Sequence, residues 1–208
     1  MKFLNCGKTP LGLYPLVDRA DKLEILYSLG VTTAQLRIKH LDGNRLEKEI
    51  VEAITISNRY NTRLFINDYW ELAIKHKAYG IHLGQEDLQE ADLEKIHRAN
   101  IRLGVSTHTT KEIELALNIH PSYLAIGPIF ETSSKEVNYS TVGIKELKKW
   151  AENLNYPVVA IGGINLKNIH DILSISNISG IAMISELIEQ KKISINKTKQ
   201  LLNLFQKK

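Results

Sequence analysis

The sequence contains little that could cross-link a fold or place it in a membrane. It has 208 residues and one cysteine, Cys6, which excludes a disulfide framework or a cysteine-based zinc site within one chain. An isolated thiol near the terminus is expected to be inert. No N-terminal run is apolar enough for a signal peptide, and no segment approaches the length of a membrane span. These absences favour a globular protein of the cytoplasm.

The excess of one sign of charge is also small, since the net charge is only +4. The densest basic stretch, "EQKKISINKTKQ" near the C-terminus, contains no aromatic residues. It is therefore more typical of the solvated face of a last helix than of an RNA-binding surface. We expect small-molecule partners, no nucleic acid and no membrane. A homo-oligomer is compatible with this surface, but no patterned patch identifies an interface.

Short apolar runs alternate with longer amphipathic segments along the whole chain. The runs cover residues 13–18, 32–39, 63–67, 80–83, 101–105, 123–127, 157–162 and 180–184. The helical patterns cover residues 20–30, 42–60, 69–77, 91–99, 110–118, 143–153, 166–175 and 185–205. Continuous apolar runs are typical of parallel strands that are buried on both faces.

Strand–helix units repeated in this way predict one α/β domain over residues 1–208, a (β/α)8 TIM barrel. No linker or low-complexity segment interrupts them. The alternative is an open doubly wound sheet, which the number of units and the lack of a G-x-G-x-x-G turn disfavour.

The second strand carries polar side chains at alternate positions, Gln35, Arg37 and Lys39. Alternate residues of a strand share one face, so we expect all three to point into the barrel. Buried cations are costly unless an opposite charge pairs with them. The pattern therefore favours a site for an anionic ligand; the alternative is a structural layer of ion pairs with inward carboxylates.

Two neighbouring strands are followed by carboxylates. Asn67 and Asp68 end the third strand, and Asp87 follows the fourth. The active site of a barrel of this kind lies at the C-terminal ends of the strands, where both carboxylates would meet. Mg²⁺ is commonly held by one or two carboxylates together with substrate phosphates, so we expect a magnesium site. The alternative is that the aspartates cap the helices that follow.

A second anion site is expected after the last two strands, in "IGGIN" (161–165) and "MISE" (183–186). Barrels often hold a phosphate there. Gly162 and Gly163 would let a ligand approach the backbone closely, although a tight turn would also explain them. Ser185 is expected to open the last helix, whose N-terminus attracts anions.

The loop over residues 127–143 is long and polar, as lids and binding loops often are. Ser106 and His108 follow the fifth strand; the histidine could serve as a base, but a satisfied or solvated side chain is the simpler interpretation. His82, among apolar neighbours, is expected to be a core histidine. Without a Ser-His-Asp set or a reactive cysteine, two anion sites at one mouth favour a metal-assisted transfer in which diphosphate leaves.

Several of these motifs together resemble thiamine phosphate synthases. The segments are "QLRIK" (35–39), "FINDYWELAIKHKAYGIHLGQEDL" (65–88), "LGVSTH" (103–108), "GPIF" with "TSSK" (127–135), "VAIGGI" (159–164) and "MIS" (183–185). They run in the order of that family and cover most of the chain. The resemblance implies a transferase of thiamine biosynthesis that joins hydroxymethylpyrimidine diphosphate to thiazole phosphate, or to its carboxylated form. Diphosphate would leave first, giving a pyrimidine methylene cation.

The resemblance also implies roles for individual residues. Those matching the pyrimidine diphosphate site are Gln35, Arg37, Lys39, Asn67, Ser106 and Lys135. Those matching the thiazole phosphate site are Thr132, Ser133, Ser134, Gly163, Ile184 and Ser185. Asp68 and Asp87 match the magnesium ligands.

One segment departs from the family pattern: the lid usually reads Pro-Thr-x-Thr-Lys, and Glu131 stands here in place of the proline. Two other functions are compatible with the fold. A thiazole tautomerase of the same superfamily would need a histidine where this chain has Pro128 in "GPIF". A non-catalytic barrel that binds a phosphorylated ligand would not need metal-binding acids.

Overall fold

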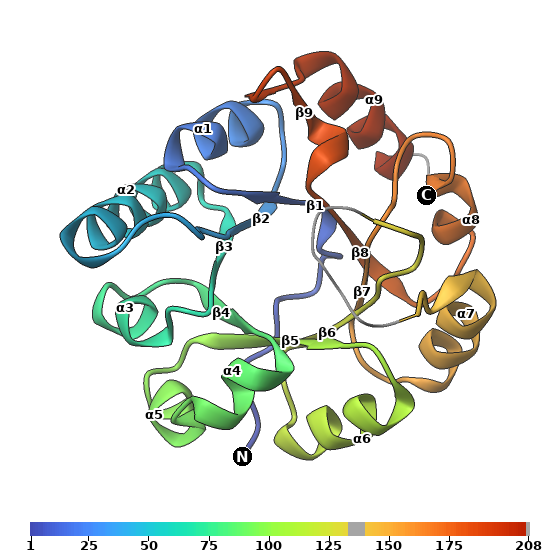
Figure 1. The fold of residues 1–208 in the computed structure, drawn as a ribbon, viewed down its shortest axis with the longest axis horizontal. Helices are drawn as coiled ribbons and strands as arrows, with labels where there is room; N and C mark the ends of the chain where they lie inside the picture. Colours follow the sequence, from blue (N-terminus) through green and yellow to red (C-terminus); the bar gives the residue numbers. More distant parts are fainter. Residues whose placement is uncertain (133–139, 207–208) are drawn as a thin grey trace.

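The computed structural model describes residues 1–132 and 140–206. Parallel strands β1 to β8 close into a barrel in chain order, and helices surround it (Figure 1). The strands are β1 (Gly12–Val17), β2 (Thr33–Leu36), β3 (Arg63–Asn67), β4 (Gly80–Leu83), β5 (Arg102–Thr107), β6 (Tyr123–Ile126), β7 (Val158–Ile161) and β8 (Ile178–Met183). The predicted barrel is confirmed, and the open sheet is excluded because β1 pairs with β8.

Helices follow the strands, and all of the described ones except α4 overlap a predicted amphipathic pattern. They are α1 (Ala20–Ser28), α2 (Gly43–Tyr60), α3 (Trp70–Lys75), α4 (Gln85–Glu90), α5 (Leu93–Arg98), α6 (Thr110–Ile119), α7 (Gly143–Asn153), α8 (Ile169–Leu173) and α9 (Ile195–Gln206). Strand side chains alternate between two cores. Leu36 and Ile66 belong to the core that the helices cover, whereas Tyr14, Phe65 and Tyr123 belong to a second cluster. None of the described helices combines the length and the apolar character needed to cross a membrane.

The predicted helix over residues 185–205 is wrong in its first half. Ser185–Leu187 form a short 3-10 helix, and an antiparallel pair, β9 (Ile188–Glu189) and β10 (Lys192–Ile193), precedes α9. Gln190 and Lys191, with φ of 47° and 65°, make the turn between these two strands. Left-handed turns usually contain glycine or asparagine, so the sequence gives no turn signal here.

The N-terminal segment is fixed beside the start of β3. The Arg63 guanidinium donates to the carbonyl oxygens of Cys6, Thr9 and Pro10, at 3.3, 3.0 and 2.7 Å. Burial raises the pKa of the Cys6 thiol to about 11, although the charge of Arg102 opposes this shift. Because the thiolate is the reactive form, this pKa supports the expectation that Cys6 is inert.

Candidate active site

One cavity collects most of the side chains that the sequence singled out. It is lined by Gln35, Arg37, Lys39, Asn67, Asp68, Asp87, Ser106, Thr132 and Ile184, among others. These residues belong to several strands and to the segments that follow them. The carboxyl ends of parallel strands meet at one face of a barrel, where active sites of this fold lie.

The cationic side of the cavity comes from the segment that follows β2. Gln35 is buried within the strand, whereas Arg37 and Lys39 lie beyond its end at Leu36. Lys39 Nζ donates to Asp68 Oδ2 at 2.9 Å, so part of the alternative ion-pair layer is present. This pair is partly exposed and contributes little to stability. Within the described residues the Arg37 guanidinium has no hydrogen bond or ion pair, which leaves it available to an anion.

The two carboxylates reach the cavity from the ends of β3 and β4. Asp68 has a φ of 65°, a left-handed conformation that is uncommon outside glycine and is found at functional sites. Asp87 lies in the first turn of α4. The N-cap residues of α3 and α4 are Tyr69 and Gly84. The alternative that these aspartates are the N-caps of the helices is therefore wrong.

The donor set is compatible with magnesium. Asp68 and Asp87 line the same cavity, and both offer oxygen ligands. Among the residues that the structure describes, no three His, Cys, Asp or Glu side chains gather into a metal-binding group. A site with two carboxylates and room for phosphate oxygens is one that Mg²⁺ prefers.

The segments after β7 and β8 only partly form the predicted second anion site. Gly162 and Ile184 line the cavity, whereas Gly163 and Ser185 are not among its lining residues. The prediction that Ser185 opens the last helix is wrong, because it begins a three-residue 3-10 helix. Such a helix is too short to support the expected dipole. Ser133, Ser134 and Lys135 lie outside the described residues.

The glycine pair also supports the alternative of a tight turn. Gly162 and Gly163 have φ of 101° and 66°, and the amide of Phe130 donates to the carbonyl oxygen of Gly162 at 3.0 Å. A Cβ at position 163 would overlap the carbonyl oxygen of Glu131 and would lie 2.7 Å from Phe130 Cβ. The glycines therefore let the chain after β6 pass close to the end of β7.

Gly163→Ala is expected to destabilise the protein more than Gly143→Ala does. Both positions have positive φ, but a Cβ at Gly143 meets nothing within 4 Å. The control substitution therefore adds only backbone strain, about 1–2 kcal/mol. The overlap at Gly163 should cost roughly a further 1–3 kcal/mol. Denaturant unfolding measures the difference, and equal losses for the two variants would contradict the close approach.

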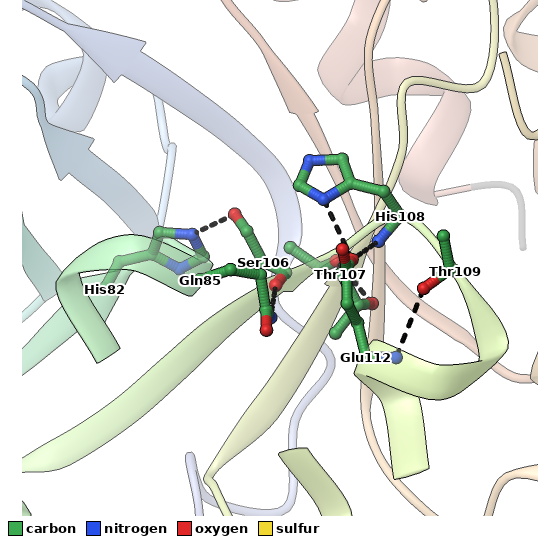
Figure 2. Close-up of polar contacts among 8 residues, drawn as sticks. His82, Gln85, Ser106, Thr107, His108, Thr109 and Glu112 are labelled. Atoms are coloured by element: carbon green, nitrogen blue, oxygen red, sulfur yellow. Dashed lines mark hydrogen bonds and ion pairs between the residues drawn. The ribbon is translucent and has the colours of Figure 1, made fainter. Parts of the chain in front are cut away.

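Two residues that the sequence did not single out hold the end of β5. Gln85 Nε2 donates to the carbonyl oxygen of Ser106 at 2.6 Å (Figure 2). Glu112 Oε2 accepts from the backbone amide of His108 at 2.6 Å and lies 3.0 Å from Nδ1 of the His108 ring. His108 is therefore a satisfied side chain at the edge of the cavity. A Thr-x-x-Glu pattern ending at Glu112 was an available signal, because it is typical of a helix N-terminus.

Comparisons with known proteins agree on one family. A family model described as thiamine monophosphate synthase matches residues 13–187. A thiamine-phosphate synthase of Yersinia pestis (strain Pestoides F) is 48% identical over 178 residues, which cover 85% of this chain and 82% of the relative. One from Photorhabdus laumondii is 48% identical over 182 residues, covering 87% and 84% of the two chains. A solved thiamine phosphate pyrophosphorylase from Pyrococcus furiosus superposes with a TM-score of 0.83 at 26% identity, covering 95% and 96%.

Proposed function

The chain belongs to the thiamine monophosphate synthase family, transferases of thiamine biosynthesis, and from this premise we propose how its cavity carries out the reaction. The substrates are hydroxymethylpyrimidine diphosphate and thiazole phosphate, or the carboxylated thiazole. The products are thiamine phosphate and diphosphate, with carbon dioxide when the carboxylated form is used. The proposal is supported most by one observation: cations and carboxylates line a single cavity at the strand ends.

The diphosphate is held by side chains at the ends of β2, β3 and β5. Arg37 supplies a planar fork of N–H donors, which suits phosphate oxygens. Lys39 adds a point charge, and it is already ion-paired with Asp68 at 2.9 Å. Ser106 and Asn67 add neutral hydrogen bonds. These donors stabilise the negative charge that develops on the leaving group.

Asp68 and Asp87 would hold Mg²⁺, which when bound supplies charge neutralisation to the departing diphosphate. The Asp68 carboxylate also balances the charge of Lys39, with which it is ion-paired.

The pyrimidine ring is expected to lie against the apolar wall formed by Leu16, Val159 and Ala182, which line the same cavity. The bond between the pyrimidine methylene carbon and the bridging oxygen breaks, and its electron pair leaves with diphosphate. The thiazole nitrogen then forms the new carbon–nitrogen bond with its lone pair. An apolar wall excludes water, which would otherwise capture the cation.

The thiazole phosphate is proposed to bind near the segments that follow β6, β7 and β8. Thr132, Gly162 and Ile184 line the cavity there. The substrate-binding roles that the resemblance implies for Ser133, Ser134, Lys135, Gly163 and Ser185 remain predictions. A cytoplasmic location remains a prediction from the sequence, which is compatible with a homo-oligomer but does not give the oligomeric state.

Removal of magnesium tests the proposal. Thiamine phosphate formation should be abolished when a chelator is added in excess and restored when Mg²⁺ is returned, because the leaving diphosphate is otherwise opposed by two carboxylates. The measurement is the initial rate with both substrates against Mg²⁺ concentration. A rate that the chelator does not change would contradict the roles of Asp68 and Asp87.

A further inference from the structure

A chain of four polar side chains, all of which line the cavity, links β1, β6, β4 and β5 inside the barrel. Tyr14 Oη lies 2.8 Å from Tyr123 Oη, and Tyr123 Oη lies 2.7 Å from His82 Nδ1. His82 Nε2 lies 2.8 Å from Ser106 Oγ (Figure 2). Tyr14, Tyr123 and His82 are 1%, 0% and 6% exposed. All four side chains line the cavity, and His82 lies between Tyr123 and Ser106.

The contact between Tyr123 and His82 depends on a glycine between them. In the barrel Gly104 of β5 pairs with His82 on one side and with Tyr123 on the other. A Cβ at position 104 would overlap the end of the Tyr123 ring, including its hydroxyl oxygen. Without that Cβ, the ring leans across β5 and stacks on the imidazole with their centroids 5.7 Å apart. Phenylalanine in place of Tyr123 and leucine in place of His82 would fill the same space without burying polar atoms. Because polar atoms are costly to bury, their presence here points to a role beyond packing.

A neutral imidazole has one donor nitrogen and one acceptor nitrogen. The hydrogen-bonded side chains from Tyr14 to Ser106 therefore have two possible proton arrangements. In the first, Tyr123 donates to Nδ1, and Nε2–H donates to Ser106 Oγ, which leaves the Ser106 proton free to point into the cavity. In the second, Ser106 donates to Nε2, Nδ1–H donates to Tyr123, and Ser106 offers only lone pairs to the cavity. Diphosphate oxygens are acceptors, so only the first arrangement lets Ser106 bind them as a donor.

We propose that His82 is a positioning residue whose ring, fixed by Tyr123, keeps the Ser106 hydroxyl directed as a donor into the cavity. The inference rests on the proposed function, because it takes Ser106 to contact the diphosphate. Tyr123 acts through His82, because its hydroxyl donates a hydrogen bond to Nδ1 and so keeps the imidazole proton on Nε2. Burial raises the pKa of Tyr123 far above its ordinary value, so its hydroxyl keeps that proton.

Tyr123→Phe tests the proposal in the full chain. It removes the hydroxyl that contacts His82, together with its contacts to Tyr14 and Gln35, while keeping the ring. We expect kcat to fall about tenfold, the scale of one hydrogen bond, with little change in KM for thiazole phosphate. The control is Tyr79→Phe, which removes a hydroxyl that donates to the Cys6 carbonyl oxygen at 3.1 Å. Tyr79 does not belong to the chain from Tyr14 to Ser106, so its variant should keep kcat. Thermal unfolding of both variants compares their structural cost.

A double-mutant cycle with Ser106→Ala identifies the route of the effect. In the Ser106→Ala background, Tyr123→Phe should change kcat by less than about twofold, because the group it acts through is gone. His82→Gln, which keeps an N–H donor near the position of Nε2, should retain more activity than His82→Leu.

Three results would overturn the proposal. They are a folded Tyr123→Phe variant with unchanged kcat, a tenfold loss that persists without the Ser106 hydroxyl, and equal activities of the two His82 variants. No thiamine phosphate formation by the unmodified chain would instead overturn the proposed function, so that the two failures are distinguishable.

Discussion

Asp87→Ala is expected to lower the rate of thiamine phosphate formation roughly 100-fold or more. Asp87 lies in the first turn of α4 and lines the cavity together with Asp68. Its loss would leave one carboxylate in the proposed magnesium site. The remaining activity should need a much higher Mg²⁺ concentration, because the metal would be held more weakly. Initial rates measured against Mg²⁺ concentration give both quantities.

The matched control is Glu86→Ala, one residue earlier. Glu86 and Asp87 are the acidic residues in the first turn of α4, so both substitutions remove the same favourable interaction with the helix dipole. Glu86 is exposed and is not among the residues lining the cavity. Glu86→Ala should therefore keep the rate and the magnesium dependence of the unmodified chain. If the two variants behave alike, Asp87 contributes only to the helix.

Arg37→Ala is expected to reduce kcat/KM for the pyrimidine diphosphate by about 100- to 1000-fold, the effect of removing one preorganised donor from a developing negative charge. Arg37 lines the cavity, and among the described residues nothing pairs with its guanidinium. Arg37→Lys should recover only part of the loss, because lysine keeps the charge but not the planar fork of donors. Steady-state rates with each substrate varied in turn measure these effects.

Arg98→Ala is the control for this second prediction. Arg98 pairs with Glu94 at 2.8 Å on the surface, where both side chains are largely exposed. Such a pair contributes little, so the variant should behave as the unmodified chain does. KM for thiazole phosphate should change little in Arg37→Ala. A loss confined to thiazole phosphate would mean that the two anion sites are exchanged.

The sequence predicted the barrel well where apolar runs are continuous and bounded by turns. The strands at residues 63–67 and 80–83 and the helix at residues 143–153 have the predicted limits. The helix α4 was not predicted, and the structure gives the reason: none of its six residues is buried, so it has no apolar periodicity to detect. The antiparallel pair before α9 was missed because Gln190 and Lys191 make its turn without glycine.

The candidate site was predictable to the extent that strand ends determine it. Asp68 and Asp87 follow neighbouring strands, so the barrel topology alone brings them to one mouth. The chain from Tyr14 to Ser106 was not predictable in this way. It joins residues of β1, β6, β4 and β5, and its central contact depends on a missing side chain at Gly104. His82 was correctly predicted to be buried, but its apolar sequence neighbours gave no sign of its partners.

The most direct test of the proposed function is the release of diphosphate by the purified chain with Mg²⁺, measured with each substrate alone and with both together. The proposed function predicts equal amounts of diphosphate and thiamine phosphate when both substrates are present. Pyrimidine diphosphate that stays bound and unchanged with both substrates present would contradict it and favour a barrel that only binds a phosphorylated ligand. Isomerisation of the thiazole without diphosphate release would contradict it in favour of a tautomerase.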